Sequence, residues 1–230
     1  ERGQSEWIYE PFDLRVFDSP VALMDAIRAK AKLQADGAEG KGLSRVLATY
    51  DWPHKGKGEN PDTQDFGGQW SVEMYRDGSR WHVGAPAGHA RGEQANDDDY
   101  FYHPWNYQIP DTVEERKASG IVKPAWAEKP HTIDEIGSTF TIQGFDLNYA
   151  GVILGPSVTY NREKHCIEFN PKASASSKAV EKRGSKRSYA VENLRNELNV
   201  LLTRGVHGLY IFAVDPALCE ELSRRQRERR

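Results

Sequence analysis

The first fifty residues show apolar positions spaced as in a strand, then a helix, then a second strand. Residues 14–17 and 45–50 are the strand candidates. Between them, one helical face carries Val21, Leu23, Met24, Ile27 and Ala31. Ser19 is a suitable N-cap, Pro20 a suitable first helical residue, and Gly37 a suitable end. Two strands joined by a helical crossover of this length predict parallel pairing, and therefore an α/β fold with a mostly parallel sheet flanked by helices.

The pattern returns after residue 137. The strand candidates in this part are residues 138–142, 149–155, 165–169 and 209–214. The run 149–155 is apolar at almost every position and bounded by glycines, which is typical of a central strand buried on both faces.

The strongest helix signal covers residues 189–204. Its apolar stripe consists of Val191, Leu194, Leu198, Leu201 and Leu202. Gly205 follows where a glycine commonly ends a helix. Asp215 and Pro216 then predict the start of a last helix. The Ser- and Lys-rich residues between these parts, about 171–188, predict a mobile loop.

Residues of about 51–130 break the alternation and predict an insertion in a single domain that covers residues 1–230. This segment holds five of the six tryptophans and many Gly, Pro and Asp residues. Residues 69–75 and 80–83 flank Asp77-Gly78, a strong signal for a β-hairpin. We therefore expect a tryptophan-rich hairpin, with exposed loops at 55–69 and 84–99.

Composition places the chain among ordinary globular proteins, with 230 residues, 38% hydrophobic and 28% charged. No apolar stretch approaches the 18 residues of a membrane span, and the N-terminus shows no signal peptide. Two cysteines make no disulfide framework, which predicts a reducing, cytoplasmic location and no membrane partner. The chain begins at Glu1 without a methionine, which predicts a processed product or a piece of a longer protein.

The charge is uneven along the chain. Residues 161–230 carry 15 basic and nine acidic side chains, whereas the whole chain has a net charge of −3. Such a split predicts an end that faces a polyanion; the alternative for the Arg-rich residues 223–230 is a solvated terminal helix.

A self-contained active site is missing from the sequence. Near Gly40-Lys41, Gly42 stands where a phosphate loop needs Ser or Thr, so the chain has no phosphate loop. It also lacks G-x-G-x-x-G, G-x-S-x-G and H-E-x-x-H motifs. Asp97 to Asp99 lack the glycine turn and distal Glu of a calcium loop, and His165-Cys166 is better explained by strand packing than by catalysis. We therefore expect no metal site in this chain.

Two segments remain, residues 138–154 and residues 196–205. The second ends a helix with Thr-Arg-Gly, which places the Arg204 guanidinium at a helix C-terminus, a favourable position for a cation. There the guanidinium fork can bind a phosphate, or it can simply cap the helix.

In this order, the two segments resemble motifs V and VI of superfamily 1 helicases. They are most similar to the Schlafen-group-3-like DNA/RNA helicase family, in the sequences Q-G-F-D-L-N-Y at 143–149 and V-L-L-T-R-G at 200–205. The family sequence pattern is also similar at residues 45–53, at Trp105-Asn106 and at Trp126-Ala127. The resemblance covers residues 12–224 and implies the RecA-like C-terminal half of a two-domain motor.

The resemblance implies roles for individual residues. Arg204 would be the arginine finger that stabilises charge on the γ-phosphoryl group. Gly144 would let the backbone approach the nucleotide, Gln143 would stand beside it, and Asp146 would contact the ribose. Thr141 would face the nucleic-acid backbone. We expect the Arg204 side chain to lie at the carboxyl edge of the sheet, close to Gly144.

The implied cofactors are ATP and Mg²⁺, both held mainly by an N-terminal RecA-like domain that brings the phosphate loop. That domain and DNA or RNA, in single-stranded form, are the implied partners. The chain departs from the family pattern at Phe140, which replaces a histidine, at Leu198-Asn199, where an aromatic residue is common, and at Thr49, which aligns with a phosphate-contacting arginine. Arg45 lies too early in its strand to replace that arginine.

The tryptophans of the insertion allow two interpretations. Trp52, Trp81 or Trp105 can stack on the bases of a single strand, or they can seal the insertion against the core. For the whole chain, the alternatives to a motor half are a non-catalytic binding module for nucleic acid or protein on the same scaffold, and a magnesium-dependent nuclease that uses the Asp97–Asp99 carboxylates.

Overall fold

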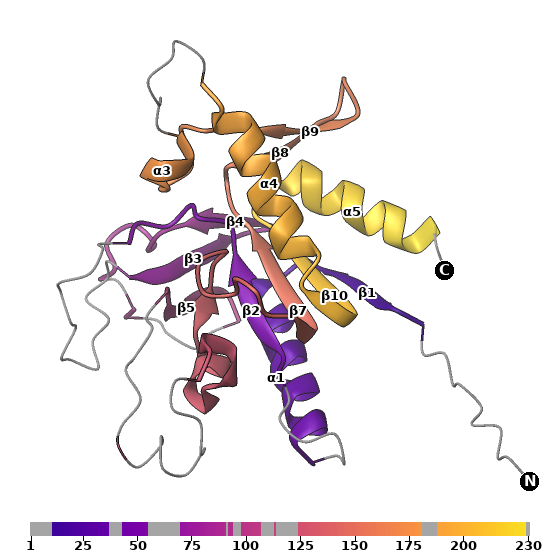
Figure 1. The fold of residues 1–230 in the computed structure, drawn as a ribbon. Coiled ribbons are helices and arrows are strands. Elements are labelled where there is room, and N and C mark those ends of the chain that lie inside the picture. Colours follow the sequence, from indigo (N-terminus) through magenta and orange to yellow (C-terminus); the bar gives the residue numbers. More distant parts are fainter. Residues whose placement is uncertain are drawn as a thin grey trace, which may run out of the picture.

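A five-stranded parallel sheet forms the centre of the molecule (Figure 1). The computed structural model describes residues 11–36, 43–54, 70–90, 92–93, 98–106, 113, 124–180 and 188–228, and the statements below refer to these residues. The strands are β1 (Asp13–Phe17), β2 (Arg45–Ala48), β6 (Ile136–Gly137), β7 (Leu147–Leu154) and β10 (Gly205–Ala213). Their order is β1-β10-β7-β2-β6, and every neighbouring pair is parallel. The predicted α/β fold and the central position of β7 are confirmed.

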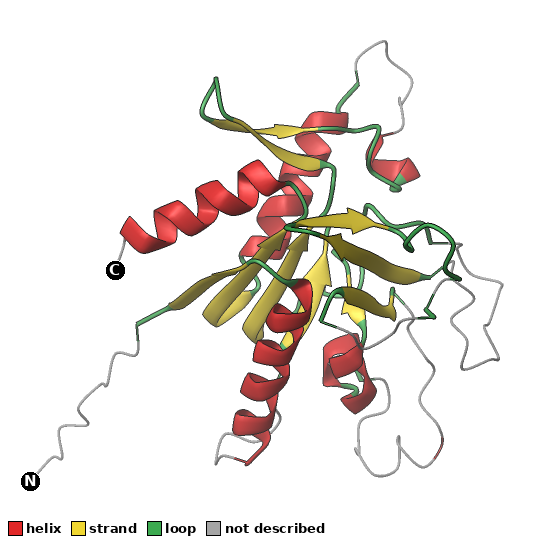
Figure 2. Ribbon diagram, turned by 180° about the vertical axis from the view of Figure 1, so that it is seen from behind, coloured by secondary structure: helices red, strands yellow, loops and turns green. Residues whose placement is uncertain are grey.

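Both faces of this sheet are buried, each under its own core cluster. Successive side chains of a strand point to opposite faces and therefore join different clusters. In β10, Leu209 and Ile211 belong to one core cluster, whereas Tyr210 and Phe212 belong to the other. Helix α1 (Pro20–Asp36) contributes to the cluster of Tyr210, and helices α4 (Ala190–Leu202) and α5 (Pro216–Glu228) contribute to that of Leu209. Figure 1 shows α4 in front of the sheet, and Figure 2 shows α1 on the opposite side.

Residues of the predicted insertion form a second, antiparallel sheet on the α1 side. Its strands are β3 (Ser71–Asp77), β4 (Arg80–Val83) and β5 (Tyr100–Pro104), in the order β4-β3-β5. Strands β3 and β4 pair as a hairpin whose turn contains Gly78 at φ +59°. Two short 3₁₀ helices, η1 (Trp126–Glu128) and η2 (Pro130–Asp134), follow. The predicted loop at 55–69 lies outside the described residues.

The predicted strand at 138–142 is wrong. These residues form turns, in which the Thr141 hydroxyl accepts from the Ser138 N–H (2.8 Å) and donates to the Ser138 carbonyl (2.9 Å). Ser and Thr hydroxyls compete with the backbone for its hydrogen bonds, and here they replace the sheet ladder with local contacts. The strand in this region is the two-residue β6, directly before the turn.

The C-terminal part follows the prediction more closely. Strand β9 (Cys166–Phe169) lies within the predicted run 165–169, and it pairs antiparallel with β8 (Val158–Asn161), which the sequence pattern missed. Both predicted helices are present as α4 and α5, and Asp215 Oδ1 caps α5 by accepting from the Leu218 N–H (2.8 Å). The predicted loop of about 171–188 contains a short helix, α3 (Ser177–Val180), and its residues 181–187 lie outside the described part.

No helix in the described ranges combines the length and the apolar character that crossing a membrane requires.

Candidate functional site

The register between β7 and β10 brings the two motif-like segments together. Gly205 pairs with Leu147, and the Leu147 N–H donates to the Arg204 carbonyl (2.7 Å). The residue that ends the α4 segment therefore lies beside the chain that leads into β7. Of the sequence-predicted residues on that chain, Asp146 contacts Arg204, whereas Gln143 and Gly144 lie two to three residues earlier and make no hydrogen bond with Arg204 in the described part of the chain.

The Arg204 guanidinium makes three weak or moderate contacts. Its Nε donates to the Val200 carbonyl (3.0 Å), and its Nη1 lies 3.4 Å from the Phe145 carbonyl and 3.5 Å from Asp146 Oδ1. The two Nη1 distances are at the long end for hydrogen bonds. Nη2 makes no hydrogen bond within the described part of the chain. The C-terminal dipole of α4 favours the cation here, and the Arg204 side chain is 23% exposed.

The site lies at the amino edge of the parallel sheet, so the expected position at the carboxyl edge is wrong. Helix α4 connects the carboxyl side of β7 to the amino end of β10, and it must therefore run back along the sheet. Helix α4 ends at Leu202 with Thr203 as its C-cap, and Arg204 follows directly before the start of β10. The segment 143–146 enters β7 at the same edge, where its residues Phe145 and Asp146 contact Arg204.

The surface beside Arg204 is open. Gly144 has φ +73°, a conformation that favours glycine, and no heavy atom lies within 4 Å of the position that a Cβ would take. Gln143 is exposed, and the Asp146 side chain is 66% exposed. A ligand can therefore approach the backbone at Gly144 without displacing a side chain.

The glycine after Arg204 is required by the backbone path. A Cβ at Gly205 would lie 2.1 Å from the Gly208 carbonyl oxygen, because the register of β10 shifts between these two residues. Such contact with backbone cannot be relieved by moving a side chain. The Thr-Arg-Gly sequence thus fixes where the arginine leaves the helix.

Thr141 and Phe140 lie in the turn that precedes this segment. The Thr141 hydroxyl is already used to close the turn on Ser138. Phe140, which replaces the family histidine, is 48% exposed and meets the ring of Tyr50 edge-on, with centroids 5.5 Å apart. The turn therefore presents an aromatic surface where the family pattern has an imidazole.

Trp52 and Trp105 are buried, and the prediction that they contact nucleic acid is wrong for this structure. They are 1% and 0% exposed, and the Trp105 Nε1–H donates to the Trp52 carbonyl (3.1 Å). Trp81 is 6% exposed and donates to the Asp18 carbonyl (3.0 Å). Rings enclosed in this way cannot stack on bases without unpacking the core, so the tryptophans seal the insertion against the main sheet.

Thr49 and Arg45 cannot supply the missing phosphate-contacting arginine. Thr49 is 1% exposed, and its hydroxyl donates to Asp51 Oδ2 (2.9 Å) and accepts from the Gly155 N–H (2.8 Å). Arg45 is 5% exposed and donates through Nε to the Thr132 hydroxyl (2.7 Å). Burial lowers the pKa of Arg45 to about 10. Both side chains hold the core together, and the departure from the family pattern remains.

At the carboxyl edge, the structure shows a polar cluster that the sequence analysis missed. Asp51, which follows β2, accepts from the Ser157 N–H (2.9 Å), and burial raises its pKa although this bond opposes the change. Glu197 of α4 accepts from the Tyr50 N–H (2.8 Å). Burial, with a smaller effect of the Asp51 charge, raises the pKa of Glu197 to about 7. A polar residue directly after an apolar strand was the only sequence signal for this cluster.

The raised pKa of Glu197 predicts a pH-dependent stability. The folded protein binds a proton on Glu197 up to about pH 7, whereas the unfolded chain releases it near pH 4.5. The free energy of unfolding should therefore fall as the pH rises through this window. Glu197→Gln keeps a carbonyl acceptor for the Tyr50 N–H. It should abolish the pH-dependent decrease in the free energy of unfolding, which is of the order of 2 kcal/mol. Urea unfolding of the unchanged protein and of Glu197→Gln from pH 4.5 to 8 measures this decrease. If the two free energies of unfolding differed by the same amount at every pH, the raised pKa of Glu197 would be contradicted.

The acidic run at 97–99 shows no metal cluster in the described part of the chain. Asp97 lies outside the described residues, and Asp99 pairs with Arg76 (2.5 Å). Among the residues that the structure describes, no three His, Cys, Asp or Glu side chains are placed to hold a metal ion together.

The comparisons with known proteins match the family that the two motif-like segments resemble. The model of the Schlafen group 3 DNA/RNA helicase domain matches residues 1–215, and the chain belongs to this family. It is 33% identical over 218 residues to the uncharacterized protein YPL245W of Saccharomyces cerevisiae, a match that covers 93% of this chain and 37% of that protein. The chain thus spans little more than a third of this relative. No solved structure matches it.

Proposed function

We propose that this chain is the RecA-like C-terminal half of an ATP-dependent nucleic-acid helicase or translocase. Arg204 acts as the arginine finger on a nucleotide whose phosphate loop and Mg²⁺ belong to an N-terminal RecA-like domain. Gly144 and Gln143 approach the nucleotide, and Asp146 contacts its ribose. Membership of the helicase-domain family supports this role, as does the length of the yeast relative outside the matched region.

One observation carries the proposal. The β7–β10 register brings Arg204 into contact with Phe145 and Asp146, although about sixty residues separate them in the sequence. A permanently charged fork next to a glycine backbone and an exposed carboxylate matches what the triphosphate and ribose of a nucleotide require. In such sites, catalysis rests on positioning and on electrostatic stabilisation of the transferred phosphoryl group.

The proposal predicts that the 230-residue chain alone is inactive. Without a phosphate loop it has no cradle for the β- and γ-phosphates, so it should neither bind ATP tightly nor hydrolyse it. Nucleotide binding by calorimetry and phosphate release measure this directly. ATP turnover by the isolated chain that Arg204→Ala abolishes would overturn the proposed division of labour.

The second candidate function is a non-catalytic module that binds nucleic acid or protein on the same scaffold. The contacts of Arg204 with Val200, Phe145 and Asp146 favour it, because the guanidinium is partly satisfied within the chain. Phe140 and the buried Thr49 also depart from the motor pattern. If Arg204→Ala leaves the nucleic-acid-stimulated ATPase of the assembled protein unchanged, the module is the better description.

A further inference from the structure

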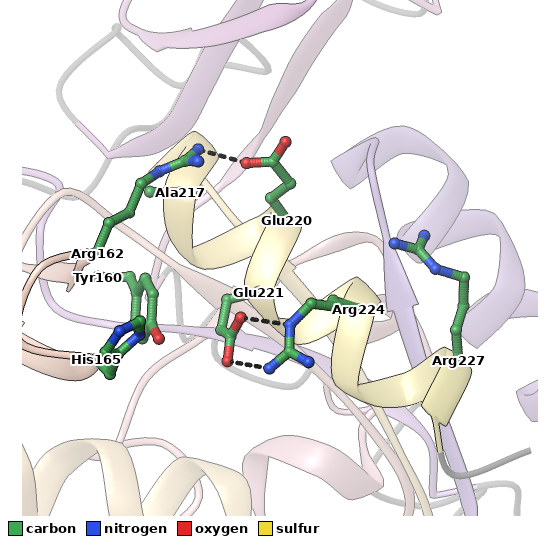
Figure 3. A pocket seen from close by; sticks show the side chains of 8 residues that line it. All are labelled: Tyr160, Arg162, His165, Ala217, Glu220, Glu221, Arg224 and Arg227. Carbon is green, nitrogen blue, oxygen red and sulfur yellow. Dashed lines mark hydrogen bonds and ion pairs between the residues drawn. The ribbon is translucent and has the colours of Figure 1, made fainter.

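A groove lies between the β8–β9 hairpin and helix α5, on a part of the molecule that the motif-like segments do not reach (Figure 3). Its volume is about 410 Å³, within the roughly 300–1,000 Å³ of small-ligand sites. One wall carries Tyr160 and His165 of the hairpin, and the other carries Arg224 and Arg227 of α5. The family match ends at residue 215, before α5 begins, so this groove combines matched and unmatched parts of the chain.

The two walls are held in place by one carboxylate. Asp215 Oδ1 accepts from the Leu218 N–H at the start of α5 (2.8 Å) and from the Tyr160 N–H of β8 (3.1 Å). Helix α5 also packs against β1, where the Cys219 thiol contacts the Phe17 carbonyl (3.5 Å). The spacing between hairpin and helix is therefore set by the fold.

The carboxylates of the groove are already paired with arginines. Glu220 pairs with Arg162 of the hairpin loop, and Glu221 pairs with Arg224 (2.9 Å) and Arg225 (2.7 Å). Arg224 pairs additionally with Glu228. Within the groove lining, three arginines thus face two carboxylates, and Arg227 makes no ion pair with any described residue.

These ion pairs can be exchanged for contacts with a ligand. Arg162 and Glu220 are both 67% exposed, and exposed pairs of this kind are weak and screened by salt. A phosphate accepts two parallel N–H bonds from a guanidinium fork, as a carboxylate does. A negatively charged phosphate of the ligand can therefore replace a glutamate as the partner of an arginine. Figure 3 shows the guanidinium groups of Arg162, Arg224 and Arg227 spread along α5, so the groove offers several phosphate positions in a row.

We propose that this groove binds the phosphodiester backbone of single-stranded nucleic acid, with the rings of Tyr160 and His165 available to stack on a base. A positively charged groove lined by aromatic side chains is the usual design for binding single strands without sequence preference. The groove lining carries Arg162, Arg224 and Arg227 against Glu220 and Glu221, so its net charge is positive. The inference rests on the proposed function only in taking nucleic acid as the ligand, because Arg204 lies outside the groove.

Fluorescence anisotropy of a labelled single-stranded oligonucleotide tests the groove, with the full chain titrated at several salt concentrations. The double variant Arg162→Ala/Arg227→Ala should bind at least tenfold more weakly. Its salt slope should fall by about 1.4, from the loss of two phosphate contacts to a single strand. Tyr160→Leu should weaken binding about fivefold or more with an unchanged salt slope, because stacking carries no charge.

The matched control is Arg28→Ala/Arg76→Ala, which removes two partly exposed, ion-paired arginines from α1 and β3 and should leave the affinity nearly unchanged. Equal weakening by both double variants, or none by the groove variant, would overturn the proposal. The proposal would also be overturned if polyglutamate competed with the labelled oligonucleotide as well as unlabelled oligonucleotide does. The same holds if inorganic phosphate displaced the labelled oligonucleotide at an equal concentration of phosphate groups. The oligonucleotide titration contains no nucleotide, so its failure would leave the proposed ATP-site role of Arg204 unaffected, because that role is tested by ATP hydrolysis.

Discussion

Arg204→Ala should lower the nucleic-acid-stimulated ATPase rate of the assembled protein by about 10³-fold or more, the effect of losing an arginine finger. The loss should appear in kcat, with little change in nucleotide affinity, because the finger acts on charge that develops in the transition state. Arg204→Lys should restore little of the rate, since an ammonium cannot reproduce the planar fork. Steady-state phosphate release with matched binding measurements gives both quantities.

Arg195→Ala is the matched control for this prediction. Arg195 lies on the same helix, is exposed, and rests over the Phe169 ring at 5.9 Å, far from the β7–β10 register. Its removal should leave the ATPase rate within about twofold of the unchanged protein, as expected for an exposed substitution. Equal losses from Arg195→Ala and Arg204→Ala would indicate a general effect on α4.

Trp105→Ala should lower the free energy of unfolding by about 3–5 kcal/mol, the range for truncating a large buried aromatic side chain. Trp105 is completely buried between the insertion and the main sheet, contacts the rings of Tyr50 and Trp52, and donates its Nε1–H to the Trp52 carbonyl. Urea denaturation followed by far-UV circular dichroism measures the change.

Phe140→Ala provides the comparison, because Phe140 is 48% exposed and should cost less than about 1 kcal/mol. Trp105→Phe should fall between the two variants, since it keeps a ring but loses the hydrogen bond. Weaker oligonucleotide binding by Trp105→Ala with an unchanged unfolding midpoint would restore the base-stacking hypothesis for this tryptophan.

The sheet and its helices were predictable because their buried positions form recognisable apolar patterns in the sequence. Strands β7 and β10 are covered on both faces, so nearly every position is apolar and the runs stand out. Helix α4 shows its buried stripe with helical spacing. The turn at 138–142 was predicted as a strand because Thr, Phe and Ile have strand propensity, yet here the Thr141 hydroxyl binds local backbone groups.

The candidate site depended on tertiary register, which no local pattern contains. Helical spacing placed Arg204 at the end of a helix, but its neighbours 143–146 came only from the family resemblance. The predicted edge of the sheet was wrong because α4 runs back along the sheet and ends at the amino edge. Likewise, composition showed that the insertion was rich in tryptophan, but the side to which Trp52 and Trp105 point is set by where the second sheet packs.

The two edges of the sheet thus differ in character. At the amino edge, Arg204 has loose contacts and an open glycine backbone beside it. At the carboxyl edge, Thr49 and Asp51 are tied into the core, and Glu197 is held against Tyr50. The proposed nucleotide site is therefore the one at the amino edge.

The most direct test of the account is a structure of the assembled protein with Mg²⁺ and a transition-state analogue of ATP bound. The account predicts that the Arg204 guanidinium leaves Asp146 and lies about 3 Å from an oxygen of the γ-phosphate mimic, with the nucleotide against Gly144. A nucleotide bound away from the amino edge of this sheet, with Arg204 still held on Phe145 and Asp146, would contradict it.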